Sequence, residues 1–199
     1  PPSLKTLGAF TTRSKPIMFM TVNKIKEFQS YEPCLTNLIE QLGGDFDHDV
    51  EFEVSSLVGG KNSVNDIIWL LGEMNDKPRL VRLAVYCAEL VLHECGESNK
   101  HVKYIPSKSI GLAKKWLIDQ SEPNATRAMF AASSMSYNTR TYSGVNRISR
   151  AVAYAAGVQY PKLCATSVIL IVNFAVENGF KSEVENKLKE LTNNENEFK

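Results

Sequence analysis

Residues 161–177 read PKLCATSVILIVNFAVE, the most apolar stretch of the chain. The β-branched run from Thr166 to Val172 is compatible with a strand. A length of about 17 residues, Pro161 at the start and Asn178-Gly179 at the end favour a helix, because strands are shorter and glycine commonly follows a helix end. We therefore expect a buried helix over this stretch.

The neighbouring segments show the spacing of amphipathic helices. Apolar residues recur every three or four positions within residues 63–74, 78–92, 107–119, 123–135 and 143–156. Ser182 with Glu185 predicts a capping box for a last helix. Alanines between residues 128 and 156, together with Gly157, allow helices to approach closely. The sequence predicts a mainly α protein, a compact bundle of short helices over residues 63–192, with a solenoid as the alternative.

The N-terminal part is predicted to be less regular. Residues 1–20 are interpreted as an irregular arm or leader, and residues 22–28 and 33–42 as helical stretches. Val50, Phe52 and Val54 alternate with acidic residues, which predicts a short strand. Residues 17–22 are the candidate partner of a short β pair. We divide the chain into this arm, an acidic segment over residues 21–62 packed on the main domain, the bundle, and a tail over residues 193–199.

Composition is that of a globular protein. The chain has 199 residues, of which 43% are hydrophobic, enough for one sizeable core. Cys34, Cys87, Cys95 and Cys164 lack metal-ligand spacing, so we expect buried free thiols and a reducing cytoplasm. No apolar run approaches the roughly 20 residues of a membrane span, and no signal peptide is visible. A soluble, cytoplasmic protein is expected.

Charge is segregated by sign along the sequence. The net charge is +1, but residues 27–60 form an acidic block with eight acidic residues and no Lys or Arg. Residues 123–176 form an acid-free block with five cations and no Asp or Glu. This segregation predicts that residues 45–53 pack near, or shield, the cations between Arg127 and Arg150. If the two blocks lay apart, each would be a partner-binding surface.

The acid-free block is the main candidate binding region. Guanidinium groups make bidentate contacts to oxyanions, and tyrosines add hydrogen bonds and stacking. An acidic protein surface is the favoured partner; nucleic acid is a weaker alternative, because the cations are sparse and no nucleic-acid motif accompanies them. The candidate residues are Arg127, Arg140, Tyr142, Arg147 and Arg150.

A second candidate lies on the helix predicted after Pro78. Arg82, Tyr86, Glu89 and His93 follow one another at steps of four, three and four, so they share one helical face. Such a face is either solvated and internally paired or binds a partner. A third possibility is an enzyme that uses Arg82, Glu89 and His93 in a deep pocket. No activated nucleophile lies nearby in the sequence, so no catalytic residue is predicted.

Two loops superficially resemble ligand-binding motifs. Residues 45–49 lack the glycine and the distant glutamate of an EF-hand. Residues 59–63 lack the glycine spacing of a phosphate loop. We interpret the second loop as a glycine turn leading to a helix capped by Ser63. The sequence therefore predicts neither a metal nor a cofactor.

Several helical segments carry a family resemblance. They read LAVYCAELVL (residues 83–92), PSKSIGLAKKWL (106–117), ATRA (125–128) and RAVAYAAG (150–157). In this order they resemble the alanine-rich helical immunity-protein family of bacterial toxin systems, over about residues 63 to 177. Related uncharacterised bacteriophage proteins have an Asp-x-x-Trp-Leu element similar to DIIWL at residues 66–70.

The resemblance implies an all-helical, non-enzymatic binding or inhibitory protein that occludes a partner macromolecule such as a toxin. It transfers no catalytic position and no cofactor. The alternative that it implies is a bacteriophage accessory protein that counters host defence or modulates a host enzyme.

Overall fold

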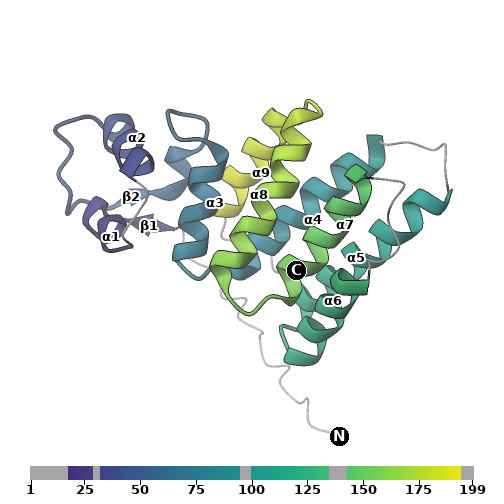
Figure 1. Cartoon of the computed structure of the whole chain (residues 1–199). Helices are drawn as coiled ribbons and strands as arrows, with labels where there is room; N and C mark the ends of the chain where they lie inside the picture. Colours follow the sequence, from purple (N-terminus) through teal and green to yellow (C-terminus); the bar gives the residue numbers. More distant parts are fainter. Residues whose placement is uncertain (1–17, 29–31, 95–99, 135–142, 194–199) are drawn as a thin grey trace, which may run out of the picture.

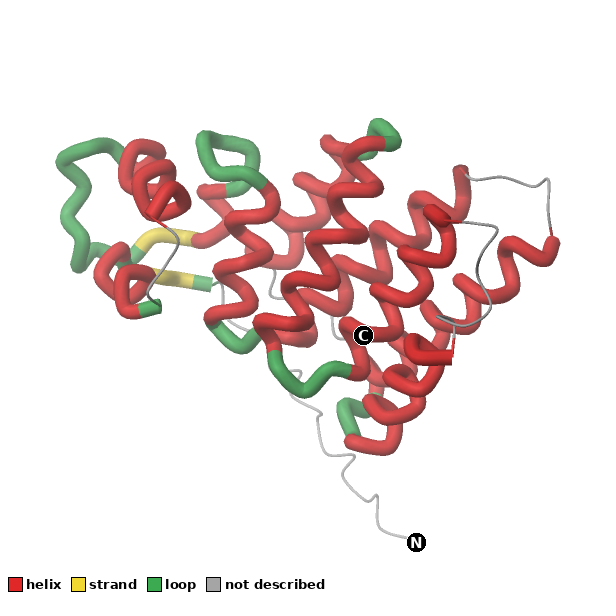
Figure 2. The backbone as a smooth tube through the Cα atoms, viewed as in Figure 1, coloured by secondary structure: helices red, strands yellow, loops and turns green. Residues whose placement is uncertain are grey.

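The computed structural model describes residues 18–28, 32–94, 100–134 and 143–193, which are mostly helical (Figures 1 and 2). From the middle of the chain onward the helices are α3 (Val64–Glu73), α4 (Lys77–Glu94), α5 (Lys100–Ile118), α6 (Glu122–Ser134), α7 (Ser143–Gly157), α8 (Pro161–Glu177) and α9 (Lys181–Asn193). They pack on one another in a compact array, which confirms the mainly α class.

Helix α8 begins and ends where its sequence predicts. Tyr160 is its N-cap, Pro161 lies in its first turn and Asn178 is its C-cap. Cys164, among other residues of one face, is fully buried. Helices α4 and α8 occupy the centre of the array: α8 packs on α3, α4, α7 and α9, and α4 additionally packs on α5. The most apolar stretch of the sequence therefore provides one of the two central helices.

Small residues set the spacing between helices. A Cβ added at Gly72 of α3 would lie 2.8 Å from the Cβ of Ala165 on α8. A Cβ added at Gly157 of α7 would lie 2.6 Å from the backbone nitrogen of Met129 on α6. Both distances are shorter than van der Waals contact, so neither position has room for a side chain larger than that of glycine. The close packing predicted for residues 128–157 is confirmed at Gly157, and Gly72 with Ala165 gives a second close approach that was not predicted.

Two buried cations tie α4 to its neighbours. The Lys77 Nζ donates to the carbonyl of Ala156 at 2.7 Å and lies 4.0 Å from the ring centroid of Trp116. Burial lowers the pKa of Lys77, and the Cys164 thiol opposes this shift. The Arg79 Nε donates to the carbonyl of Leu191 at 2.7 Å. The start of α4 thus holds the ends of α7 and α9.

The thiols described by the structure behave as the composition predicts. Cys87 and Cys164 are free and buried. Burial raises the pKa of each to about 12, so both remain protonated and unreactive at neutral pH. The side chains of Cys34 and Cys95 lie outside the described residues.

The N-terminal part forms the predicted β pair and two helices, α1 (Val22–Glu27) and α2 (Glu32–Leu42). Strand β1 (Phe19–Met20) runs antiparallel to β2 (Phe52–Glu53), with Phe19 opposite Glu53. Figure 2 shows this pair at one end of the molecule. A short 3₁₀ helix, η1 (Val54–Leu57), follows β2 and packs on α9. Val50 precedes β2 and is exposed, so the strand is shorter than the alternation of residues 50–54 predicts.

Polar side chains fasten this N-terminal part. The Gln41 amide nitrogen donates to the carbonyl of Ser56 at 2.8 Å, while its oxygen accepts from the Asn62 side chain at 2.8 Å. Asn62 ends the glycine turn, in which Gly59 adopts a φ of +80°. Ser63 then caps α3 in a reciprocal capping box with Asp66. The predicted glycine turn and Ser63 cap are confirmed.

Two helix starts differ from the sequence prediction. Helix α5 begins at Lys100, before the predicted residue 107, and passes through Pro106 at the cost of one backbone hydrogen bond. Helix α9 begins at Lys181, so the predicted capping box of Ser182 and Glu185 is wrong. Gly179, with a φ of +95°, turns the chain so tightly that the helix starts directly after Phe180.

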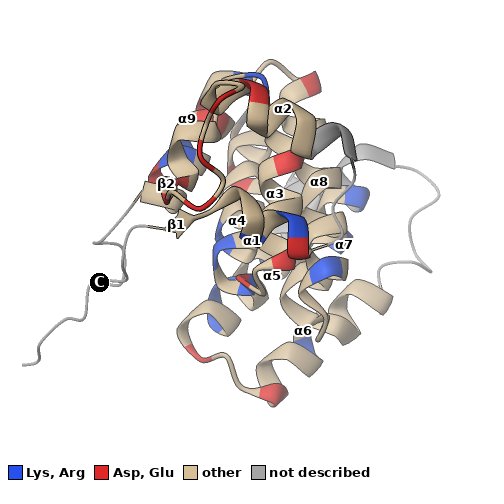
Figure 3. Ribbon diagram, turned by 90° about the vertical axis from the view of Figure 1, so that its left-hand side faces the viewer, with Lys and Arg blue, Asp and Glu red and all other residues tan. Residues whose placement is uncertain are grey.

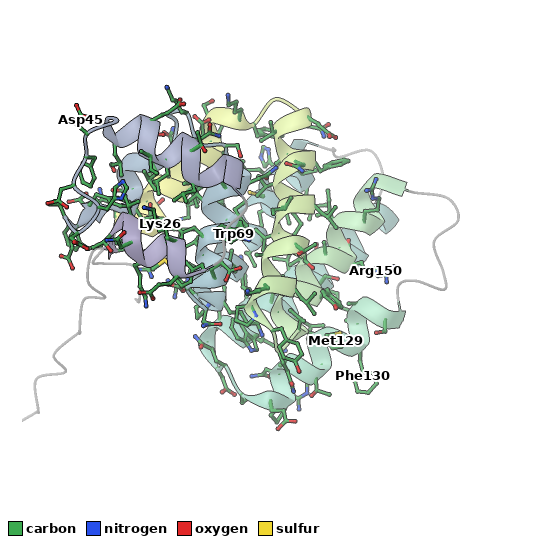
Figure 4. The ribbon with its side chains drawn as sticks, turned by 60° about the vertical axis from the view of Figure 1, so that its left-hand side comes forward. Lys26, Asp45, Trp69, Met129, Phe130 and Arg150 are labelled. Atoms are coloured by element: carbon green, nitrogen blue, oxygen red, sulfur yellow. The ribbon has the colours of Figure 1, made fainter. Side chains whose placement is uncertain are left out.

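Residues 45–53 and the cations of α6 and α7 lie toward opposite ends of the molecule. Figure 1 places α1 and α2 at one end and α6 and α7 at the other. Figure 3 shows acidic residues gathered on the loop between α2 and β2, and Figure 4 shows Asp45 and Arg150 on opposite sides. The predicted docking of residues 45–53 on the cations within the chain is therefore wrong, because α3, α4 and α8 separate the two regions.

Candidate binding groove between α7 and α8

A groove of about 450 Å³ lies between α7 and α8. Helix α7 contributes Arg147, Arg150 and Tyr154, and helix α8 contributes Leu170 and Phe174. Buried aliphatic side chains of both helices complete the lining. The groove belongs almost wholly to the acid-free block, and among its described lining residues only Glu177, at the end of α8, is acidic.

The sequence of α7 explains this placement. Positions 147, 150 and 154 are spaced by three and four residues, so they share one helical face. Ile148 and Val152 point to the core, where they are almost fully buried. The two guanidinium groups therefore stand about one helical turn apart, on the side of α7 that borders the groove. Arg147 faces solvent, as predicted from its position off the apolar phase.

The two arginines of the groove have no partner among the described residues. Arg147 and Arg150 are exposed, and neither forms a hydrogen bond or an ion pair within the described part of the chain. In contrast, Lys162, the cation at the start of α8, reaches Glu73 of α3 at 2.8 Å. The charge of the two arginines is thus available to an external anion.

Helix α8 contributes side chains that the sequence analysis missed. We expected α8 to be a buried helix, yet Leu170 is 53% exposed and Leu163 is 45% exposed. Lys162, Thr166 and Asn173 lie on the same exposed side. The sequence did contain a weak signal for this solvent-facing side. Polar residues recur with helical spacing at positions 162, 166, 173 and 177.

The remaining candidates of the acid-free block do not line the groove. Arg127 lies on α6, is exposed, and donates to the side-chain oxygen of Asn124 at 3.4 Å. Phe130 of α6 is 71% exposed and projects from the helix in Figure 4. Arg140 and Tyr142 lie outside the described residues. The structure therefore brings Arg147 and Arg150 together but leaves Arg127 apart from them.

The second candidate face, on α4, is divided between two neighbours. Glu89 and His93 line an open groove between α4 and α5, where Lys114 pairs with Glu89 at 2.5 Å. Tyr86 faces α9, with the Lys187 Nζ 5.5 Å from its ring centroid, and burial raises its pKa. Arg82 is half-buried and does not line the groove. The structure does not gather Arg82, Glu89 and His93 in one deep pocket.

Among the described residues, no three His, Cys, Asp or Glu side chains are grouped so that they could hold a metal ion. The His48 ring, within the acidic segment, instead contacts the Lys26 Nζ at 2.9 Å. Of the helices described here, none has both the length and the apolar character needed to cross a bilayer.

Comparison with known proteins gives no family assignment. No protein-family model, no curated protein and no solved structure matches the chain. Functional inference therefore depends on the residues and geometry of the chain itself.

Proposed function

We propose that this chain is a non-enzymatic binding protein, similar in action to an immunity protein, that occludes an acidic surface of a partner macromolecule. The α7–α8 groove is its contact surface. One observation carries the proposal: two exposed arginines that have no partner among the described residues border a groove that also offers an exposed leucine and a half-buried phenylalanine. Arg147 and Arg150 supply charge, and Leu170 and Phe174 supply apolar area.

This combination suits recognition of a protein. Arginine and tyrosine are enriched among the residues that dominate binding energy in protein interfaces. A partner carboxylate can accept two parallel hydrogen bonds from one guanidinium group, and an adjacent apolar side chain can cover Leu170. Charge steers the encounter, and buried apolar area slows dissociation. A bacteriophage accessory protein acting on a host enzyme would use the same groove.

The protonated, unpaired thiols of Cys87 and Cys164 support action in a reducing compartment, and we propose the cytoplasm. The partner class follows from the groove, since an acidic protein, such as a toxin, complements its charge. Nucleic acid is less suited, because two free arginines form no extended cationic track.

The test compares three immobilised baits in a bacterial lysate: the wild type, Arg147→Glu with Arg150→Glu, and Lys108→Glu with Lys115→Glu. The third is a matched control, since both lysines are exposed on α5 and the change in net charge is identical. We expect one protein to be retained by wild type and control but lost from the groove variant. The purified partner should then bind the groove variant at least 10-fold more weakly. Equal retention by all three baits would contradict the proposal.

A further inference from the structure

The molecule carries two surfaces of opposite charge that cannot reach each other within one chain. The arginines of the α7–α8 groove stand on α7, away from the acidic loop, which we define as residues 43–51 between α2 and β2 and which lies with α1 and α2 at the far end of the molecule (Figures 1 and 3). A second copy of the chain brings the two surfaces within reach.

The acidic loop presents carboxylates to solvent. Asp45, Asp47, Asp49 and Glu51 are all exposed, and Val50 between the last two is 49% exposed. None of the four carboxylates forms an ion pair with a described residue. The nearby cations are engaged elsewhere, since Lys24 pairs with Glu27, Lys61 pairs with Glu40, and Lys26 contacts His48.

Hydrogen bonds hold the loop in a defined shape. The Asn23 side chain donates to Asp49 at 2.7 Å, and the Asp49 backbone nitrogen donates to the Asp47 side chain at 3.0 Å. Phe46 packs edge-on against Phe52, with ring centroids 6.1 Å apart. The loop is therefore anchored to α1 and β2, so little conformational freedom is lost when it docks.

We propose that the acidic loop of one copy docks in the α7–α8 groove of a second copy. The two surfaces are complementary in the arrangement of their side chains as well as in charge. Val50 is flanked by Asp49 and Glu51, and the exposed Leu170 of the groove is bordered by Arg147 and Arg150. Val50 then covers Leu170 while the carboxylates meet the guanidinium groups.

The assembly is head to tail. Because the two surfaces differ and lie apart on the molecule, each contact leaves one free loop and one free groove, and further copies can add. The inference rests on the proposed function, because it uses the same groove. Self-association would regulate partner binding there, since a docked loop excludes an external acidic partner. Exposed ion pairs are weak and screened by salt, so the association is weak, reversible and lost at high salt.

The test is sedimentation velocity of the full chain at about 0.02 M and about 0.5 M salt, where the Debye length falls several-fold. The groove variant is Arg147→Glu with Arg150→Glu, and the loop variant is Asp45→Lys with Glu51→Lys. We expect the wild type to form a salt-sensitive series of oligomers and each variant alone to be monomeric. An equimolar mixture of the two variants should associate again at low salt, because the acidic loop of the groove variant fits the basic groove of the loop variant, and the basic loop of the loop variant fits the acidic groove of the groove variant.

The variant carrying all four substitutions is the decisive control, since its loop is basic and its groove acidic. It should associate again at low salt. Monomeric wild type at low salt, or oligomers that persist in both variants, would overturn the inference. The loop variant keeps the groove, so partner capture by that bait tests the proposed function separately. If the loop variant captures a partner but the wild type does not self-associate, only the inference is refuted. If the wild type self-associates but the loop variant captures no partner, only the proposed function is refuted.

Discussion

At the end formed by α1, α2 and the β pair, polar side chains bridge segments that are distant in sequence, whereas the helical end, formed by α6 and α7, is packed through small residues. Gln41 joins α2 both to η1 and to the glycine turn. At the other end, Gly157 and Ala128 let backbones approach, and most buried positions of α7 are aliphatic or alanine.

The contrast shows where polar side chains are needed for folding and where they are not. The N-terminal end uses Asn23, Gln41 and Asn62 to hold its loops. The helical end is stabilised by burial, so Arg147 and Arg150 are not required by the fold. A free charge beside an apolar groove costs little stability and is available for binding.

A large effect on stability is expected for Gly157→Ala, which disrupts the close packing of the helical end. The new Cβ would lie 2.6 Å from the Met129 backbone nitrogen and 2.9 Å from the Ala125 carbonyl oxygen. Backbone atoms cannot rotate away, so α6 must shift. We expect the free energy of unfolding in urea to fall by about 3 kcal/mol.

Gly111→Ala is the matched control, because it is the same change within a helix. A Cβ at Gly111 of α5 meets nothing within 4 Å. Alanine is the better helix former, so this variant should gain up to about 1 kcal/mol. Equal effects of the two changes would show that close approach does not hold α6 on α7.

An intermediate effect is expected for Gln41→Ala at the polar end. The substitution leaves the nearly buried Asn62 side chain and the Ser56 carbonyl without their partner, which costs about 1–2 kcal/mol. Hydrogen exchange should accelerate in residues 18–62 and stay unchanged in α7, because regions of a protein open separately.

Glu40→Ala provides the control for Gln41→Ala. It removes only the exposed pair between Glu40 and Lys61, which is worth about 0–1 kcal/mol. Faster exchange throughout the chain in Gln41→Ala would mean that both ends unfold as one unit, and the contrast between them would then be wrong.

Much of the fold follows from local sequence signals. Pro161 and Asn178-Gly179 bound α8, and Ser63 caps α3, because these residues act through nearby backbone groups. The alternation of Phe52 and Val54 with acidic residues located the β pair. The capping box predicted at Ser182 failed because the Gly179 turn, rather than the side chains, sets the start of α9.

The candidate site was predicted less completely. Arg147 and Arg150 were identified because a stretch without acidic residues is visible in the sequence. The contribution of Leu170 was missed, since the exposure of an apolar residue depends on which neighbours cover it. The predicted docking of residues 45–53 on the cations between Arg127 and Arg150 was wrong for a similar reason: sign segregation gives complementarity but not distance, and α3, α4 and α8 lie between the acidic loop and helices α6 and α7.

The smallest expected effect on stability is that of reversing both arginines of the groove, Arg147→Glu with Arg150→Glu. Both side chains are exposed and have no described partner, so the free energy of unfolding should change by no more than about 0.5 kcal/mol per site. Arg79→Glu is the contrasting variant, because Arg79 is 8% exposed, pairs with Asp76 and donates to Leu191. Its reversal should cost about 3–5 kcal/mol through an unpaired buried charge. The measurement is the melting temperature of the wild type, the groove variant and Arg79→Glu. A melting temperature of the groove variant far below that of the wild type would show that its arginines stabilise the fold, and loss of binding could then not be assigned to the groove.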